Sequence, residues 1–334
     1  MHKKPMHRLL TLGSLGLALS ALFATAAFAE KSELKVSKQY GLGYLPLIVA
    51  EEQKLIEKHA ATAGLGAIKV EWLTFGGGAV ANDALLSGNV DLVSGGAAPF
   101  IRLWDKTGGK AKALLALNEA PVIFVSNNPK VKTLRDLTTQ DKIALPAVKV
   151  SIQAVVLQIA AAKEFGIKNY DKLDHLTVTL KHPDALAALL SDRSEITGHI
   201  GLEPYSQIEL QNPKNRQIVN SFDLFGAPHS ANLVWTTDAF YTQNPKLAHA
   251  FLAAVIEADE WIAAHPAEAV DLYLKSYNSK ESPELIAKLL KEVEQYRVKP
   301  TENITVFSDF LYDTGAIKSK PKSWKELFFD AVAR

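Results

Sequence analysis

Two glycine-rich turns carry the residues best suited to binding chemistry, Gly76–Gly78 and Ser94–Gly96. Each turn follows an apolar segment that predicts a strand, and each precedes a segment that predicts a helix. Glycine lets a backbone turn sharply and approach another group closely, while the free amides at a helix N-terminus favour anions. Both turns are therefore expected to offer backbone N–H groups to a ligand, with close packing of the turns as the alternative.

Other polar side chains stand at comparable positions. Tyr44 follows the first predicted strand and either presents its hydroxyl to a cleft or packs on the next helix. Asn118 ends a later strand, where it is either a ligand contact or a loop residue. Ser151 and Gln153 open a long predicted helix, and a plain N-cap explains Ser151 equally well.

His199 and Glu203 flank another predicted strand end, just before Pro204. A carboxylate there suits an amine or a ring N–H group, although the helix dipole alone also satisfies a glutamate at a helix start. The expected ligand-binding residues are Tyr44, Gly76, Gly77, Gly78, Ser94, Gly95, Gly96, Asn118, Ser151, Gln153, His199 and Glu203.

The composition argues against several kinds of site. The chain has no cysteine, so thiolate catalysis, cysteine–metal sites and disulfides are ruled out. The histidines after residue 29 show no pairs at the helical or hairpin spacing of metal ligands. The glycines of Gly76–Gly78 are contiguous and lack the G-x-G-x-x-G spacing of a dinucleotide site. We therefore expect neither a metal nor a cofactor.

Residues 1–29 predict a cleaved secretory signal peptide, because a basic start and a short apolar run precede the A-x-A site Ala27-Phe28-Ala29. Its removal takes away three of the 37 basic residues and none of the 36 acidic ones, leaving a net charge of −2. That balance argues against nucleic acid or an anionic membrane surface as partner. With no thiol for lipidation, we expect a diffusible periplasmic monomer that is not embedded in a membrane.

The order of predicted elements indicates an α/β protein in two units. Strands at 34–40, 68–75, 92–94 and 111–117 alternate with helices, and a second alternation runs from 133 to 222. This order predicts a mostly parallel sheet flanked by helices in each unit. A strand at 231–236 and a helical tail from 245 follow. Two crossings between the units, at 118–126 and 231–238, predict a hinge and a cleft.

Several motifs also stand in the order and spacing of a known family. They are Gly43-Tyr44-Leu45-Pro46, Phe75-Gly76-Gly77-Gly78, Ala84-Leu85-Leu86-Ser87-Gly88-Asn89-Val90-Asp91, Gly95-Gly96-Ala97-Ala98-Pro99 and the segment 183–191. With them the chain resembles the periplasmic substrate-binding proteins of nitrate/sulfonate/taurine-type ABC transporters, a family that includes binders of thiamine-pyrimidine precursors. One departure is the turn before Ser151, which lacks the glycine that oxyanion-gripping relatives often have there.

The resemblance implies a two-lobed type II periplasmic-binding fold that closes on one small ligand. Together with the two crossings expected from the element order, this places residues 30–120 and 237–334 in the first lobe and 121–236 in the second. It further implies delivery of the solute to an ABC transporter permease and ATPase complex, without catalysis.

Three ligand classes stay open under the resemblance. Taurine fits if Glu203 and Ser151 both act, other sulfonates or nitrate fit if only the anion end is used, and an aminopyrimidine fits if Glu203 and aromatic rings dominate. Two competing functions are an enzyme on this fold and a periplasmic sensory receptor. The related desulfinases and pyrimidine synthases use cysteine, which this chain lacks.

Overall fold

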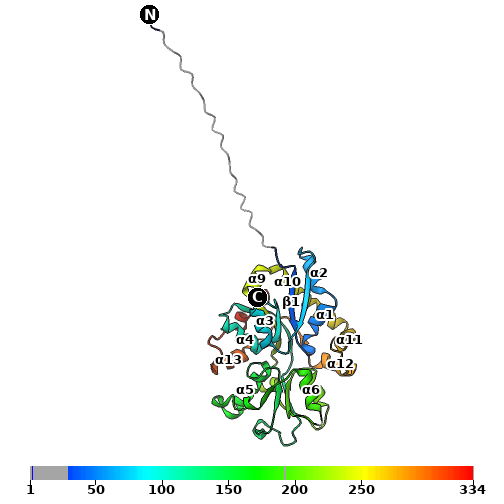
Figure 1. Ribbon diagram of the computed structural model, residues 1–334, viewed down its shortest axis with the longest axis vertical. Helices are drawn as coiled ribbons and strands as arrows, with labels where there is room; N and C mark the ends of the chain where they lie inside the picture. The colour runs from blue at the N-terminus through cyan, green and yellow to red at the C-terminus, as the bar shows by residue number, and fades with distance from the viewer. Residues whose placement is uncertain (1, 3–28, 192, 334) are drawn as a thin grey trace.

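The computed structural model describes residues 2, 29–191 and 193–333, so nearly all of the expected signal peptide lies outside the described residues. Two α/β bodies are stacked along the long axis of the molecule (Figure 1). We call the body with strands β1–β4, β10 and β11 lobe I, and the body with strands β5–β9 lobe II. Lobe I combines the blue-to-cyan and yellow-to-red parts of the chain, whereas lobe II is green.

Lobe I is built on six strands. They are β1 (Glu33–Lys38), β2 (Lys69–Thr74), β3 (Val93–Gly96), β4 (Ala111–Glu119), β10 (Ser230–Thr237) and β11 (Gln295–Tyr296). Strands β1 and β2 pair in parallel, and a parallel bridge between Val36 and Leu92 joins β1 to the segment that leads into β3. Strand β10 lies between β3 and β4 and runs antiparallel to both. The resulting sheet is mixed.

Lobe II has a five-stranded sheet in the order β7-β6-β8-β5-β9. Its strands are β5 (Ile123–Ser126), β6 (Ile143–Leu145), β7 (Thr177–Thr179), β8 (Gly198–Gly201) and β9 (Arg216–Asn220). Strand β6 is parallel to β7 and β8, while β5 is antiparallel to β8 and β9.

The expected α/β architecture is confirmed, and the mixed pairing of both sheets refines it. The strands that alternate with helices share one direction within each sheet, as crossover connections require. Strands β5 and β10 run opposite to these strands, and each enters its sheet after a crossing from the other lobe; the short strand β11 also runs antiparallel to β4.

The return crossing lies earlier in the chain than expected. The sequence pattern places 231–236 in the second lobe, but β10 pairs with β3 and β4 along its length and is buried there. The crossing therefore precedes β10 and follows helix α8 (Ser221–Phe225). We propose lobe boundaries at 29–120 with 230–333 for lobe I, and 121–229 for lobe II.

Helices cover both sheets. Lobe I carries α1 (Leu45–Glu52), α2 (Leu55–Thr62), α3 (Gly78–Leu86), α4 (Ala97–Lys106), α9 (Asp238–Gln243), α10 (Pro245–Ala264), α11 (Pro266–Ser276), α12 (Pro283–Glu292), α13 (Thr305–Asp313) and α14 (Asp330–Ala333). Lobe II carries α5 (Ile152–Phe165), α6 (His182–Leu190), α7 (Tyr205–Leu210) and α8. Within the described part of the chain, none of the helices has the length and apolarity needed to cross a bilayer.

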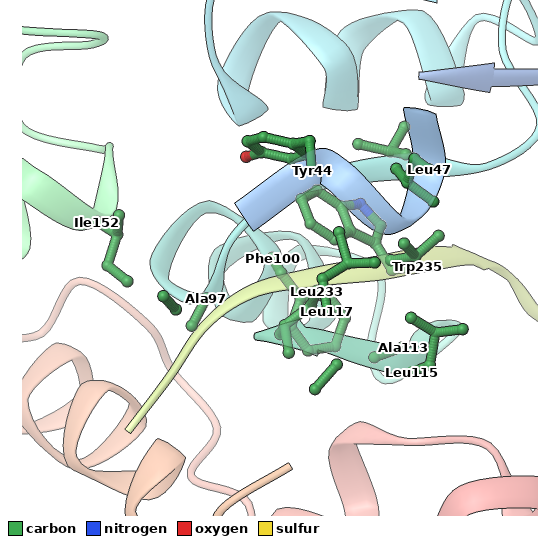
Figure 2. Close-up of a cluster of buried hydrophobic side chains, with 14 of the residues drawn as sticks. Tyr44, Leu47, Ala97, Phe100, Ala113, Leu115, Leu117, Ile152, Leu233 and Trp235 are labelled. Carbon is green, nitrogen blue, oxygen red and sulfur yellow. The ribbon is translucent and has the colours of Figure 1, made fainter. Parts of the chain in front are cut away.

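The core of lobe I surrounds Trp235, which is fully buried on β10 beside Phe100 (Figure 2). The Trp235 indole N–H donates a hydrogen bond of 2.9 Å to Asn82 Oδ1, so its only polar group is satisfied inside the protein. Helix α10 of the C-terminal tail packs on α1 and α2, as expected for a tail that covers the first unit.

Candidate functional site

A small cavity of about 20 Å³ lies between the two lobes, which is room for a water molecule or two. Lobe I lines it with Gln39, Tyr40, Tyr44, Gly77, Gly78, Gly96, Pro99 and Asn232. Lobe II lines it with Pro146, Ser151, Ile152, Gln153, His182 and Leu202. Because both lobes contribute, any larger solute requires the lobes to separate before it enters.

The N-termini of four helices meet at this cavity. Gly77 and Gly96 are the N-cap residues of α3 and α4 in lobe I, and Ser151 is the N-cap of α5 in lobe II. His182, the first residue of α6, completes the set. Each N-terminus carries about half a positive charge and unpaired backbone amides. Together they make the cavity favourable for a negatively charged group.

The glycines at this edge are needed for space rather than for unusual backbone angles. Gly77 and Gly96 have φ values of 179° and −67°, which any residue adopts. A Cβ atom on Gly96, however, would lie 2.7 Å from Ile152 of lobe II, and one on Gly77 would lie 3.4 Å from Pro146. Figure 2 shows Ile152 reaching from lobe II toward Ala97 at the start of α4. These glycines let the lobes approach each other closely.

Other glycines of the two turns pack inside lobe I. A Cβ atom on Gly78 would lie 2.9 Å from Pro99, and one on Gly95 would lie 2.9 Å from Trp235. Gly76 differs from these two, because a Cβ atom on it would meet the flexible side chain of Lys181 of lobe II, at 3.1 Å. Gly77 and Gly96 therefore lie at the cleft, as expected for ligand proximity, whereas close packing of the turns explains Gly78 and Gly95.

Ser151 fulfils the capping role expected from the sequence and also lines the cavity. Its hydroxyl accepts a hydrogen bond of 3.2 Å from the backbone N–H of Ala154. The first residues of α5, Ile152 and Gln153, line the cavity beside this cap.

In lobe I a chain of amide hydrogen bonds leads from the cavity into the core. The Tyr44 hydroxyl donates to Asn232 Oδ1 at 2.9 Å, and Asn232 Nδ2 donates to Asn118 Oδ1 at 3.0 Å. Asn118 Nδ2 then donates to Glu294 Oε2 at 2.7 Å. Burial raises the pKa of the Glu294 carboxyl to about 8. Asn118 thus supports a cavity-lining residue instead of lining the cavity itself.

In lobe II a second chain leads inward from Gln153. Gln153 Nε2 lies 3.1 Å from His182 Nε2, and His182 Nδ1 lies 2.8 Å from His199 Nε2. His199 Nδ1 lies 2.6 Å from Glu209 Oε1. Burial lowers the pKa of both imidazoles and raises the pKa of the Glu209 carboxyl well above its usual range. His199 is therefore one layer behind the cavity.

Glu203 lies outside the cavity lining, although the sequence predicts that it faces a ligand. Its side chain is fully buried, with Oε1 accepting a long hydrogen bond of 3.4 Å from Gln207. Burial raises the pKa of this carboxyl to about 7. The Glu203 backbone oxygen accepts from the Leu42 N–H at 2.9 Å, so this segment joins the lobes through the main chain.

The structure thus divides the expected residues into two groups. Tyr44, Gly77, Gly78, Gly96, Ser151 and Gln153 line the cavity. Gly76, Ser94, Gly95, Asn118, His199 and Glu203 do not belong to its lining. Ser94, for example, is fully buried and bonded to Ser37 through its hydroxyl and its amide.

Sequence reasoning missed several lining residues, and most of them follow one rule. Gln39 and Tyr40 come after β1, Pro146 after β6, and Leu202 after β8, so the carboxyl-edge rule that selected the glycine turns also applies to them. Asn232 had no such signal. It lies near the start of the antiparallel strand β10, which reaches the same edge with its opposite end.

Comparisons with known proteins identify the family and the fold. Residues 27–273 match the model of the NMT1-like family. No curated protein sequence matches the chain.

Similar solved structures include the alkanesulfonate-binding protein SsuA from Xanthomonas axonopodis pv. citri bound to MOPS, with 17% identity and a TM-score of 0.68 over 87% of this chain and 96% of that one. The periplasmic aliphatic sulphonate binding protein SsuA from Escherichia coli has 21% identity and a TM-score of 0.66, over 91% and 99%. The periplasmic nitrate-binding protein NrtA from Synechocystis PCC 6803 has 17% identity and a TM-score of 0.67, over 87% and 83%. At these identities the likeness establishes the fold.

The expected resemblance is therefore confirmed: the chain belongs to the NMT1-like family and has the fold of periplasmic binding proteins.

Proposed function

We propose that this protein is the solute-binding component of an ABC importer. It captures a small organic anion between its lobes and passes it to a membrane permease, after export to the periplasm as a monomer. The observation that carries the proposal is the convergence of the N-termini of α3, α4, α5 and α6 on one interlobe cavity. A single anion at this point is attracted by helices of both lobes and therefore favours the closed arrangement.

Opening and closing follow from the two connections between the lobes. The chain crosses at 120–122 and again at 226–229, and the described residues contain no disulfide that would tie the lobes together. Two short connections allow a hinge. A bound anion stabilises the closed form because it contacts α3 and α4 on one side and α5 and α6 on the other.

The lining favours an organic anion over a bare inorganic one. Tyr40, Ile152 and Leu202 offer aromatic and aliphatic surface beside the helix N-termini. Apolar surface of this kind suits an alkyl or aryl group attached to an oxyanion. We therefore place alkane- and arylsulfonates first, ahead of nitrate.

The cavity lining also argues against solutes that need a carboxylate partner. Glu203 was the expected partner for the amine of taurine or for an aminopyrimidine, and it does not line the cavity. Among the described residues, the cavity lining contains neither aspartate nor glutamate. Taurine thus ranks below simple alkanesulfonates, and an aminopyrimidine such as a thiamine precursor ranks last. We propose no catalytic role.

Isothermal titration tests this proposal. The protein from Glu30 onward is titrated with ethanesulfonate, an arylsulfonate, taurine, nitrate and an aminopyrimidine, in amine buffers that contain no sulfonate. We expect saturable binding of the sulfonates and weaker binding of taurine. Binding of the aminopyrimidine alone would replace the proposed anion with the alternative solute. Turnover of any bound compound would refute a purely binding role. If the solute-bound protein acts on a separate receptor kinase instead of a permease, a sensory role would be favoured.

A further inference from the structure

The chain of buried side chains behind Gln153 can move a proton, and this property extends the proposed function. Gln153, His182, His199 and Glu209 are each at least nine-tenths buried. Their consecutive contacts of 3.1, 2.8 and 2.6 Å leave no gap between the cavity lining and Glu209. Imidazole has one nitrogen on each side of its ring, so a pair of linked imidazoles can accept a proton at one end and release another at the far end.

The hydrogen atoms of this chain point away from the cavity. Gln153 Nε2 is only a donor, so His182 Nε2 accepts from it. A neutral His182 then carries its hydrogen on Nδ1 and donates it to His199 Nε2. His199 in turn donates from Nδ1 to Glu209 Oε1. In this direction the lone pair of His182 Nε2 is occupied by the Gln153 N–H group, so His182 has no donor to offer an anion.

One added proton reverses the direction. When a proton from the cavity binds His182 Nε2, His182 passes its Nδ1 proton to His199 Nε2. His199 passes its own Nδ1 proton to Glu209 Oε1, and the carboxylate becomes a neutral carboxyl. One proton enters and none leaves, and both imidazoles end neutral. His182 Nε2 now carries an N–H group, and because Gln153 Nε2 is also a donor, the Gln153 side chain has to turn away and leave that N–H group to the solute.

We propose that an anionic oxygen of the solute accepts a hydrogen bond from His182 Nε2, and that Glu209 is the group whose protonation makes this donor available. This inference rests on the proposed anionic solute. In the closed protein the negative charge of the solute takes the place of the negative charge of Glu209. The second oxygen of Glu209 has no hydrogen-bond partner among the described residues, which makes the ionised form costly and the neutral form favoured. Burial raises the pKa of this carboxyl in accordance with that role.

The other ionisable groups near the chain do not connect it to the cavity. Helix α7 contributes Tyr205, whose ring stacks on His182 with centroids 5.4 Å apart. Glu203 precedes that helix and interacts with Glu209 through like charge. Helix α6 contributes Asp184, which is exposed.

The remaining surroundings add few charges. Lys181 lies at the start of α6, with its side chain near Gly76. Across the cleft, lobe I contributes Tyr40 and Tyr44 to the same cavity. The packed strands β5 and β6 contain no ionisable side chain.

The sign of the effect is fixed by the proton count. Below the pKa of Glu209 in the ligand-free protein, the neutral carboxyl is already present and binding is independent of pH. Above that pKa each binding event takes up one proton, so affinity falls by about tenfold per pH unit. Ethanesulfonate is a suitable probe, because its sulfonate stays ionised from about pH 5 to about pH 9.

The experiment is titration of ethanesulfonate into wild-type protein and variants across that pH range, in two amine buffers with different heats of ionisation. We expect the wild-type affinity to fall at high pH, with a buffer-dependent heat that corresponds to one proton. In Glu209→Gln the amide Nε2–H donates to His199 Nδ1 at every pH. This variant should therefore bind with pH-independent affinity and without proton uptake, while Glu209→Leu should bind weakly throughout.

Two further variants locate the titrating group. Asp184→Asn lies on the same helix as His182 and should keep the wild-type profile. Glu203→Gln should keep the uptake of one proton, with the fall in affinity moved to lower pH because a like charge near Glu209 is removed. Loss of the pH dependence in Glu203→Gln, or its persistence in Glu209→Gln, would overturn the inference. Wild-type binding with one affinity at every pH would also overturn it, while leaving the proposed function intact. Absence of binding by any anion would refute the proposed function and the inference together.

Discussion

Each lobe connects the cavity to a buried glutamate, but the two connections are chemically different. In lobe I the chain runs from Tyr44 through Asn232 and Asn118 to Glu294. In lobe II it runs from Gln153 through His182 and His199 to Glu209. Side-chain amides have fixed donors and acceptors, whereas neutral imidazoles exchange the two roles. The first chain therefore holds its cavity-lining groups in one state, and the second has two.

This difference predicts separate roles for lobe I and lobe II in solute binding. In the proposed function lobe I offers backbone amides at Gly77 and Gly96, beside a fixed polar network that begins at Tyr44. Lobe II offers a donor at His182 that depends on protonation. We therefore expect pH to act on solute binding through lobe II, while the raised pKa of Glu294 acts only on the stability of lobe I.

The largest expected effect comes from a substitution that prevents lobe I and lobe II from closing on each other. In Gly96→Ala the new Cβ would lie 2.7 Å from Ile152 across the cleft, at a φ value that alanine tolerates. Overpacking of this kind costs about 1–3 kcal/mol, which corresponds to roughly five- to 150-fold weaker sulfonate binding with little loss of lobe I stability. Titration and thermal unfolding of the variant measure the two quantities.

The control for this variant is a second substitution on the opposite wall. Ile152→Ala removes the side chain that the new methyl group meets, so Gly96→Ala should weaken binding less in the Ile152→Ala protein than in wild type. An equal loss in both backgrounds would mean that the glycine is not an interlobe contact. Gly77→Val, which directs a larger side chain at Pro146, should also weaken binding while the protein stays folded.

The second prediction separates the two glutamates. The pKa of Glu294 is about 8 in the folded protein, above the usual value for glutamate. The folded state thus keeps a proton that the unfolded state loses, and this contribution to stability is present below the unfolded pKa and disappears as pH rises toward about 8. Glu294→Gln should remove that loss and be more stable than wild type by about 1 kcal/mol or more at about pH 8.5, with little gain at about pH 5.

Urea unfolding at both pH values checks this prediction, with Glu292→Gln as the exposed control near the same helix end. Sulfonate binding by Glu294→Gln should keep the wild-type pH profile. A flattened binding profile in this variant would contradict the division of tasks between the lobes, because the amide chain would then transmit protonation to the cavity.

The smallest expected effect concerns the helix cap in lobe II. Ser151→Ala removes the acceptor for the Ala154 N–H, which costs about 1 kcal/mol of stability. Because the first amides of α5 then order less well, sulfonate binding should weaken severalfold. Ser151→Asp keeps a cap but adds a negative charge, so it should retain stability and lose sulfonate affinity. If Ser151→Asp binds as well as wild type, the N-terminus of α5 does not face the anion.

The fold was largely predictable because its signals are local. Glycine turns after apolar strands, the cap at Ser151 and the apolar periodicity of the helices indicate the element order, and the family resemblance supplies the architecture. The position of β10 was not predictable in the same way. Its mainly apolar residues 231–236 suit either a crossing strand or a central one, and only pairing with β3 and β4 decides between them.

The residues that line the cavity could be predicted only in part. Residues that follow parallel strands were found by the edge rule, and those that escaped notice, such as Gln39 and Leu202, satisfy the same rule without a glycine signal. His182 and His199 are far apart in sequence, so spacing did not reveal their contact. Glu203 looked like a ligand partner from its place after β8, but its side chain turns into the protein, where burial raises its pKa to about 7.

The most direct test of the central claim is a crystal structure of the protein from Glu30 onward with ethanesulfonate, grown in a buffer without sulfonate. We predict that the sulfonate group lies between the N-termini of α3 and α4 on one side and α5 and α6 on the other, within hydrogen-bonding distance of His182 Nε2. A sulfonate bound away from these helix ends, or held by one lobe alone, would contradict the claim.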